Sequence, residues 1–319
     1  MIVELLLVFI GLALVVFGAD WLVDGSSAVA RRANVSEFVI GLTIVGFGTS
    51  MPELVVSVTA AIEGNADISV GNIIGSNTLN ILFGLGLTAL IAPIAITRRN
   101  IRSDIPISIG AVILMLLMGM NSSILGIGTS DSLTRVEGIV FLLVFAAYIY
   151  YCFKTDDGAD IETAPVKEIG LAKAVVLILA GLVGLVLGGR LFVDNAVDFA
   201  HRVGVSEKFI AITLIAGGTS LPELVTCFVA AAKKKGQMAL GNILGSNLFN
   251  ILLILGIAAT LQPLSLAGIK MVDASVMLLS VLLVALSYFT LKNKKIDRLD
   301  GALMLLLEAA YMVWLFIKL

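Results

Sequence analysis

Two near-identical stretches, 170 residues apart, each place one glutamate inside otherwise hydrophobic sequence. The first reads GFGTSMPEL and contains Glu53; the second reads AGGTSLPEL and contains Glu223. Each is followed by a polar segment, GNIIGSNTLN ending at Asn80 or GNILGSNLFN ending at Asn250. About half of the positions from 35 to 86 are identical to their partners, more than shared hydrophobicity would give by chance. Because a carboxylate is costly inside a membrane, the matched pair predicts an ion site between two repeats.

The composition is that of an integral membrane protein. Of the 319 residues, 59% are hydrophobic and 14% charged, and the mean hydropathy is +1.07. The N-terminal apolar run lacks a basic start, since Glu4 stands there, and is interpreted as a retained helix. A single histidine and two cysteines without metal spacing argue against a zinc site or a histidine-based triad. No basic cluster interleaved with aromatic residues suggests nucleic acid, and no protein partner is implied, so a monomer is expected.

Long apolar stretches between polar breaks predict an all-α protein with ten transmembrane helices. The expected spans are 2–30, 37–62, 69–96, 104–121, 135–153, 170–200, 206–232, 238–262, 272–291 and 299–317. They form two five-helix repeats, residues 1–153 and 170–319, joined by a cytoplasmic connector over 154–169. Five is odd, so the second repeat enters the membrane from the opposite side and the repeats are inverted.

The distribution of charged residues among the loops predicts which side of the membrane each loop faces. The loop after the second helix carries Glu63 and Asp67, whereas its counterpart carries three lysines at 233–235. Basic loops favour the cytoplasm, and the other basic loops fall on the same side as these lysines. We therefore expect both termini to be extracytoplasmic, in a multi-pass protein of the plasma membrane.

The residues around each glutamate suit a desolvated cation. Pro52 and Pro222 are expected to break helices two and seven, because proline lacks an N–H and clashes with the preceding turn. The freed carbonyls are tolerated at membrane depth where something satisfies them, and a cation can do so. Asn, Ser and Asn then recur at four-residue spacing on one face of the next helix in each repeat, at residues Asn72, Ser76, Asn80, Asn242, Ser246 and Asn250.

These hard oxygen donors match calcium, which takes 6–8 oxygens, better than magnesium, copper or zinc. The two carboxylates can also hold sodium ions or bind protons, so either can be the counter-ion. No cofactor is expected, and no phosphate-binding loop indicates ATP hydrolysis.

Simpler interpretations exist for several of these residues. Small and polar residues at helix interfaces often only pack or hydrogen-bond, and an intramembrane glutamate can be structural. Asp20, Asp24 and Asp194, near the ends of helices one and six, are expected to be water-exposed or capping. Glu37 and Glu207 follow serines just ahead of apolar runs, which indicates helix starts.

The paired GTSxPE and GNxxGSNxxN segments resemble the two alpha repeats of the calcium/cation antiporter superfamily, in particular its prokaryotic sodium/calcium exchanger branch. The resemblance covers nearly the whole chain. It implies alternating access around a central site at the repeat interface, with Glu53 and Glu223 as the central carboxylates. It also implies hydroxyl, amide and carbonyl ligands from Thr49, Ser50, Thr219, Ser220, Ser76, Ser246, Asn80 and Asn250, and from the backbone of Gly46 and Ala216.

One position departs from that family. Well-known sodium/calcium members carry an aspartate where this chain has Asn250, so only two ionisable groups remain in the site. We expect a Ca²⁺/Na⁺ antiporter, with a Ca²⁺/H⁺ antiporter as the alternative. A cation channel could use the same oxygens but would leak calcium without a counter-gradient. A two-carboxylate membrane enzyme is the weakest alternative, because it leaves the threonines, serines and prolines unexplained.

Overall fold

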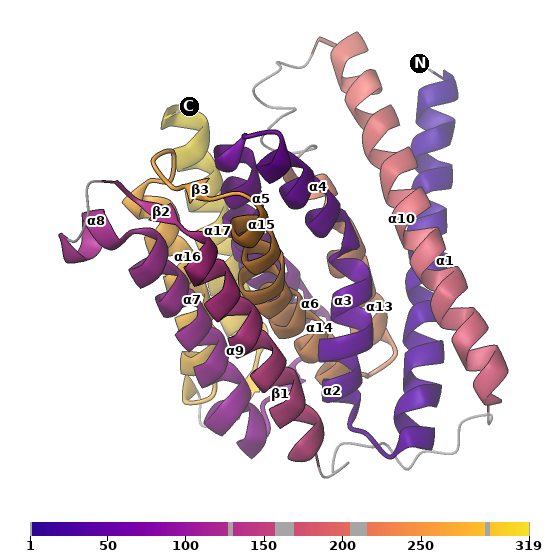
Figure 1. Ribbon diagram of the computed structural model, residues 1–319. Coiled ribbons are helices and arrows are strands. Elements are labelled where there is room, and N and C mark those ends of the chain that lie inside the picture. Colours follow the sequence, from indigo (N-terminus) through magenta and orange to yellow (C-terminus); the bar gives the residue numbers. More distant parts are fainter. Residues whose placement is uncertain (1, 127–129, 157–168, 205–215, 291–293, 319) are drawn as a thin grey trace.

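A computed structural model describes residues 2–126, 130–156, 169–204, 216–290 and 294–318, and it is built almost entirely of helices (Figure 1). Within these residues, seven helices are long and apolar enough to cross a membrane, or eight if the bent pair Glu37–Thr49 and Met51–Ile62 is one span. Two shorter apolar helices, Leu221–Ala232 and Met271–Ser287, accompany them. The chain is therefore a multi-pass helical membrane protein, and both termini lie at the same end of it (Figure 1).

The first half begins with a long helix and continues through helices interrupted by π-helical turns. The long helix is α1 (Ile2–Ala33). The remaining helices are α2 (Glu37–Ile40), η1 (Gly41–Val45), α3 (Gly46–Thr49), α4 (Met51–Ile62), α5 (Ala66–Leu79), η2 (Asn80–Leu85), α6 (Gly86–Ile91), η3 (Asn100–Asp104), α7 (Ile105–Gly119), α8 (Asn121–Leu125) and α9 (Arg135–Lys154).

The second half repeats this order. It starts with a second long helix, α10 (Leu171–Arg202). The helices that follow are α12 (Ala216–Gly218), α13 (Leu221–Ala232), α14 (Gly236–Leu248), η5 (Phe249–Ile254), α15 (Leu255–Leu261), α16 (Met271–Ser287) and α17 (Arg298–Lys318). Most of the expected connector, residues 157–168, and the first part of the expected seventh helix, residues 205–215, lie outside the described residues.

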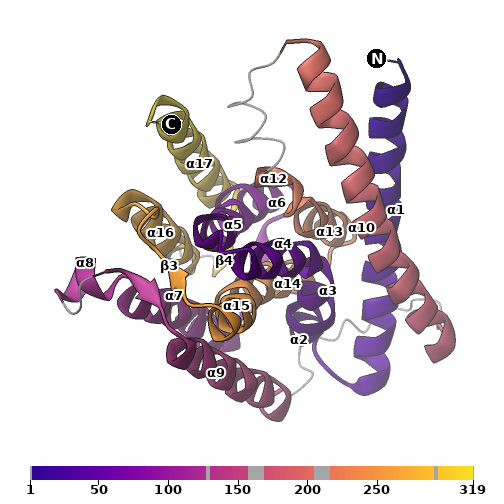
Figure 2. The same cartoon turned by 45° about the horizontal axis from the view of Figure 1, so that its top comes forward.

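Two short antiparallel sheets link the halves at opposite ends of the molecule (Figure 1). Strand β1 (Ile94–Ala95) pairs with β4 (Lys295–Ile296), and β2 (Ser132–Leu133) pairs with β3 (Leu264–Ser265). With the top of the molecule turned forward, α4, α5, α13 and α14 lie at the centre of the protein, with α7, α9, α16 and α17 around part of it (Figure 2).

Helices α1 and α10 run side by side as a pair along one flank of that centre (Figures 1 and 2). Their contact is built on glycines at matched positions 170 residues apart. A Cβ on Gly18 would lie 2.8 Å from the carbonyl oxygen of Gly181, and one on Gly188 would lie 2.8 Å from that of Gly11. Only glycine allows backbones this close, so the two helices pack tightly along this line of matched glycines.

Close glycine packing also joins the first half-helix to the second half of the chain. A Cβ on Gly241 would clash with the Phe38 carbonyl, and one on Gly245 would clash with the Leu42 carbonyl. Helix α14 therefore lies directly against α2 and η1. The glycines at the equivalent positions of α5, Gly71 and Gly75, have no such neighbour among the described residues.

Charged residues at the helix ends mostly cap or pair, whereas Asp20, Asp24 and Asp194, expected near helix ends, lie inside α1 and α10. Ser36 caps α2 by accepting a hydrogen bond from the Val39 N–H at 3.2 Å, as expected for a helix start. Glu37 follows it and pairs with Lys235 Nζ at 2.5 Å. Asp20 and Asp24 are partly exposed and both pair with Lys233, and Asp194 is exposed, whereas Glu207 lies outside the described residues.

Candidate cation site between the two repeats

The two glutamates lie just after breaks of the same shape. Ser50 has φ −80° and ψ 9°, Ser220 has φ −84° and ψ 0°, and neither continues the α-helix before it. In the first repeat the helix axis bends by 50° at this point. Pro52 and Pro222 sit in the first turn of α4 and α13, where a missing N–H costs nothing. The expected break at helix two is confirmed; for the second repeat, most of the preceding half-helix lies outside the described residues.

Each glutamate is held by a serine from the other repeat. Ser50 Oγ donates to Glu223 Oε1 at 3.0 Å, and Ser220 Oγ donates to Glu53 Oε1 at 3.0 Å. Ser76 Oγ also lies 3.4 Å from Glu53 Oε1. Both glutamates are fully buried. Each half therefore donates a serine hydrogen bond to the glutamate of the other half. The two serines are 170 residues apart, as are the two glutamates.

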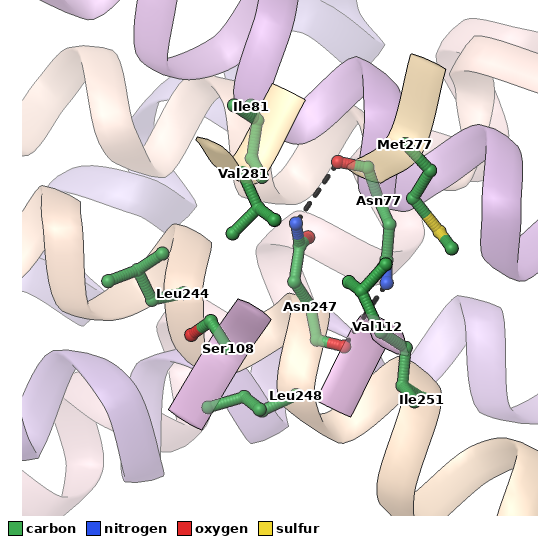
Figure 3. Close-up of a pocket in the computed structure, with 10 residues that line it drawn as sticks. All are labelled: Asn77, Ile81, Ser108, Val112, Leu244, Asn247, Leu248, Ile251, Met277 and Val281. Carbon is green, nitrogen blue, oxygen red and sulfur yellow. Dashed lines mark hydrogen bonds between the residues drawn. The ribbon is translucent and has the colours of Figure 1, made fainter. Parts of the chain in front are cut away.

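The asparagines that follow Ser76 and Ser246 in the paired motifs hold the side chains of Asn80 and Asn250 in place. Asn77 Nδ2 donates to the Asn247 carbonyl at 3.2 Å, and Asn247 Nδ2 donates to the Asn77 carbonyl at 3.0 Å (Figure 3). Their side-chain oxygens accept from the next asparagines, Asn77 Oδ1 from Asn250 Nδ2 at 2.9 Å and Asn247 Oδ1 from Asn80 Nδ2 at 3.2 Å. Asn77 and Asn247 are not among the predicted ligands, although both repeat at the same place in the two motifs.

Among the residues that the structure describes, four buried oxygen atoms at this site have no hydrogen-bond partner. They are Glu53 Oε2, Glu223 Oε2, Asn80 Oδ1 and Asn250 Oδ1. All four residues are fully buried. Unpartnered buried oxygens are rare because each costs about 1–3 kcal/mol, and more when charged. Four of them in two symmetry-matched pairs, with no donor supplied by the described residues, make this a candidate cation site.

Further hydroxyl and carbonyl groups surround these oxygens. Thr49 Oγ1 lies 3.2 Å from Asn242 Oδ1, and Ser246 Oγ lies 3.4 Å from the Gly46 carbonyl. In the other half, Thr219 Oγ1 donates to Asn72 Oδ1 at 3.4 Å. The carbonyl of Ala216 belongs to α12, and its part in the site stays a prediction.

The chemistry of this arrangement is that of reversible cation binding. Every group in it is an oxygen donor, and no cysteine or histidine joins the two carboxylates. Within the described ranges, no cluster of three or more His, Cys, Asp or Glu side chains forms a metal site. A cation held here therefore meets two carboxylates and neutral oxygens, a mixture that suits calcium or sodium.

Comparison with known proteins agrees with this geometry. The profile of the family described as sodium/calcium exchanger protein matches residues 3–154 and again residues 173–317, one match for each half. The sodium/calcium exchanger MaX1 of Methanosarcina acetivorans is 30% identical over 347 residues, covering 98% of this chain and 99% of that protein. The inner membrane protein YrbG of Escherichia coli is 33% identical over 326 residues, covering 99% and 96%.

Among solved structures, the sodium-calcium exchanger NCX_Mj soaked with Na⁺ and Ca²⁺ superposes with a TM-score of 0.84. It is 34% identical in sequence, and the superposition covers 98% of both chains. This likeness extends over both halves and includes the helices that carry the buried glutamates. The chain is a membrane transporter of the cation-exchanger type rather than an enzyme, and it belongs to the sodium/calcium exchanger family.

Proposed function

We propose that this protein exchanges Ca²⁺ for Na⁺ by alternating access, with the ions competing for one central site between Glu53 and Glu223. The observation that carries the proposal is the set of four buried, unpartnered oxygens on Glu53, Glu223, Asn80 and Asn250. Serine, threonine and carbonyl oxygens complete the shell, and Ala216 contributes its carbonyl. The names of the relatives MaX1 and NCX_Mj support sodium and calcium as the exchanged ions.

The coupling between calcium and its counter-ion follows from the charge of the two carboxylates. With the site empty, two carboxylates face each other in a buried environment, and this arrangement resists the switch between inward and outward access. Calcium or its counter-ions neutralise the carboxylates and allow the switch. Since both ions use the same oxygens, one must leave before the other binds.

The proposed topology has ten helices in two inverted repeats, residues 1–153 and 170–319, with the connector in the cytoplasm. Both termini lie outside the plasma membrane, and the protein acts as a monomer without a cofactor. The ends of α1, α9 and α13 that meet basic turns lie opposite the two termini (Figure 1), which supports this orientation.

A proton-coupled exchanger is the second candidate, because Asn80 and Asn250 are both neutral and leave only two acids in the site. Radioactive calcium uptake into proteoliposomes separates the two. Uptake driven by internal sodium alone supports the sodium exchanger, and uptake driven by an outward proton gradient alone supports the proton exchanger. Calcium entry with neither gradient would indicate a channel.

Substitution of a central carboxylate tests the site itself. We expect Glu53→Gln to abolish gradient-driven calcium uptake, because one neutralising charge and one cation ligand are lost together. The protein should still fold, since the amide can keep its hydrogen bond with Ser220. Asp198→Asn, on an exposed face of α10, is the matched control and should transport like the unmodified protein. Full uptake by Glu53→Gln would contradict the proposed site.

A further inference from the structure

Asn242 stands second in the GNILGSNLFN motif, on the face of α14 that also carries the predicted ligands Ser246 and Asn250. The residue is fully buried, and its amide is engaged at both ends. Its nitrogen Nδ2 donates to the Glu223 carbonyl at 3.3 Å and to Cys227 Sγ at 3.2 Å. Its oxygen Oδ1 accepts from Thr49 Oγ1 at 3.2 Å. The amide therefore joins α13 to the end of α3.

The orientation of this amide follows from the groups around it. A backbone carbonyl can only accept a hydrogen bond, so the nitrogen of Asn242 must face the Glu223 carbonyl. The oxygen then faces Thr49, and because an amide oxygen can only accept, the hydroxyl of Thr49 must be the donor. The single hydroxyl proton of Thr49 consequently points to Asn242, and the lone pairs of Thr49 Oγ1 face away from it.

A second acceptor for the same proton lies close to Thr49. The Gly46 carbonyl is 3.4 Å from Thr49 Oγ1, three residues earlier in α3. Threonine hydroxyls in helices commonly donate to a carbonyl of the preceding turn, and here that carbonyl is itself a predicted cation ligand. The contact with Asn242 is shorter, at 3.2 Å, and it draws the hydroxyl proton away from the Gly46 carbonyl.

Cys227 holds the nitrogen end of the Asn242 amide. It is fully buried on α13, and its thiol donates to the Ala239 carbonyl of α14 at 3.5 Å. The thiol proton is thus directed to the backbone, which leaves a sulfur lone pair for the N–H of Asn242. Contacts therefore run in sequence from Cys227 through Asn242 to Thr49.

The other repeat contains the same sequence of contacts with one atom type changed. Asn72 Nδ2 donates to Ser57 Oγ at 3.0 Å, and Thr219 Oγ1 donates to Asn72 Oδ1 at 3.4 Å. Each of these three residues is 170 positions from its counterpart around Asn242, so that Ser57 takes the place of Cys227. The two halves thus share a hydrogen-bond acceptor at this position, a hydroxyl in one and a thiol in the other.

We propose that these paired asparagines are positioning residues and not cation ligands. Asn242 directs the hydroxyl proton of Thr49 away from the cation, and Cys227 keeps the amide in that orientation. The matching residues of the other repeat act on Thr219 in the same way. A hydroxyl proton turned toward a cation would repel it, so the direction of this proton sets how well the hydroxyl binds. Thr49 is here a ligand of the transported cation, which rests on the proposed exchange function.

The calcium concentration for half-maximal uptake tests this role. We expect Asn242→Ala to raise it about tenfold, since residues that orient metal ligands typically contribute a factor of about 10–100 to affinity. Cys227→Ala should raise it about threefold, because the amide loses one neutral hydrogen bond. Cys227→Ser restores the acceptor found in the other repeat and should recover this loss. The maximal rate should change little in the Cys227 variants, and Cys152→Ala, at a buried cysteine on α9, is the matched control.

A double-mutant cycle separates positioning from a general effect on packing. If Cys227 acts through the Thr49 hydroxyl, Cys227→Ala should raise the half-saturation of the Thr49→Val protein by less than about twofold, because no hydroxyl proton is left to direct. A further threefold rise in the double variant would overturn the proposal. Half-saturation by Asn242→Ala equal to that of the Cys152→Ala control would overturn it as well.

Infrared spectroscopy tests the contact without transport. In a Cys152→Ser background, Cys227 carries the one remaining thiol, so its S–H stretching band is assigned without ambiguity. We expect Asn242→Ala to shift this band, because the sulfur loses the N–H that it accepts. An unshifted band would refute the contact between Cys227 and Asn242. A shifted band in a protein that exchanges no calcium under any gradient would count against the proposed function and not against the contact.

Discussion

At the scale of single residues, the two repeats are joined by hydrogen bonds between a serine of one repeat and the glutamate of the other. Ser50 and Ser220 each occupy one carboxylate oxygen of the opposite repeat and leave the second oxygen unpartnered. The hydroxyl thus fixes the direction of the carboxylate without neutralising it. Asn77 and Asn247 act similarly on Asn250 and Asn80, because each accepts from the amide nitrogen and leaves the amide oxygen for a ligand.

Removing one of these hydroxyl groups should weaken cation binding without removing a charge. We expect Ser220→Ala to reduce calcium affinity about tenfold, since a hydrogen bond to a charged group contributes roughly 1.5–3 kcal/mol. Ser50→Ala should have an effect of similar size, because the two bonds have the same length of 3.0 Å. Calcium titration of the purified protein by calorimetry measures both affinities. Two variants that bind calcium as tightly as the unmodified protein would show that the serines do not orient the carboxylates.

At the scale of elements, the pair α1 and α10 meets the centre of the protein through one ion cluster. Lys233 Nζ, at the end of α13, lies 2.7 Å from Asp20 Oδ1 and 2.6 Å from Asp24 Oδ1 on α1. The positions matching Lys233 and Asp20 in the other half are Glu63 and Arg190, where the charges are reversed. In the described part of the chain, Glu63 and Arg190 form no ion pair. The described part of the molecule therefore has an ion contact at one end of the α1 and α10 pair whose counterpart at the other end is not made.

Loss of the Lys233 contact should favour opening at its end of the molecule. The ion contact of Lys233 is partly exposed and worth no more than about 1 kcal/mol. Lys233→Gln should therefore shift the equilibrium between the closed and open forms of this end by up to about fivefold, without unfolding the protein. The buried thiol of Cys227 on α13, in a Cys152→Ser background, reports this opening through its rate of reaction with a polar thiol reagent. Lys234→Gln is the control, because Lys234 forms no ion pair among the described residues. Equal labelling rates in the two variants would show that the Lys233 contact does not hold this end closed.

At the scale of the whole molecule, duplication decided how much could be predicted from sequence. Glu53, Glu223, Asn80 and Asn250 were predicted as ligands because each motif appears twice, and each has an oxygen without a hydrogen-bond partner among the described residues. The close approach of α14 to η1 was inaccessible, because sequence similarity alone does not say which glycine meets which backbone.

The same duplication determines the number of acids in the candidate site, and this number leads to an expected stoichiometry of exchange. With asparagine at both 80 and 250, the site holds two carboxylates, which one Ca²⁺ or two monovalent cations neutralise equally. We therefore expect electroneutral exchange, with calcium uptake into proteoliposomes unaffected by a potassium diffusion potential set with valinomycin. Asn250→Asp adds a third acid, so a third monovalent cation can bind and uptake should become dependent on the potential. Potential-dependent uptake by the unmodified protein would mean that a charge outside Glu53 and Glu223 moves with each cycle.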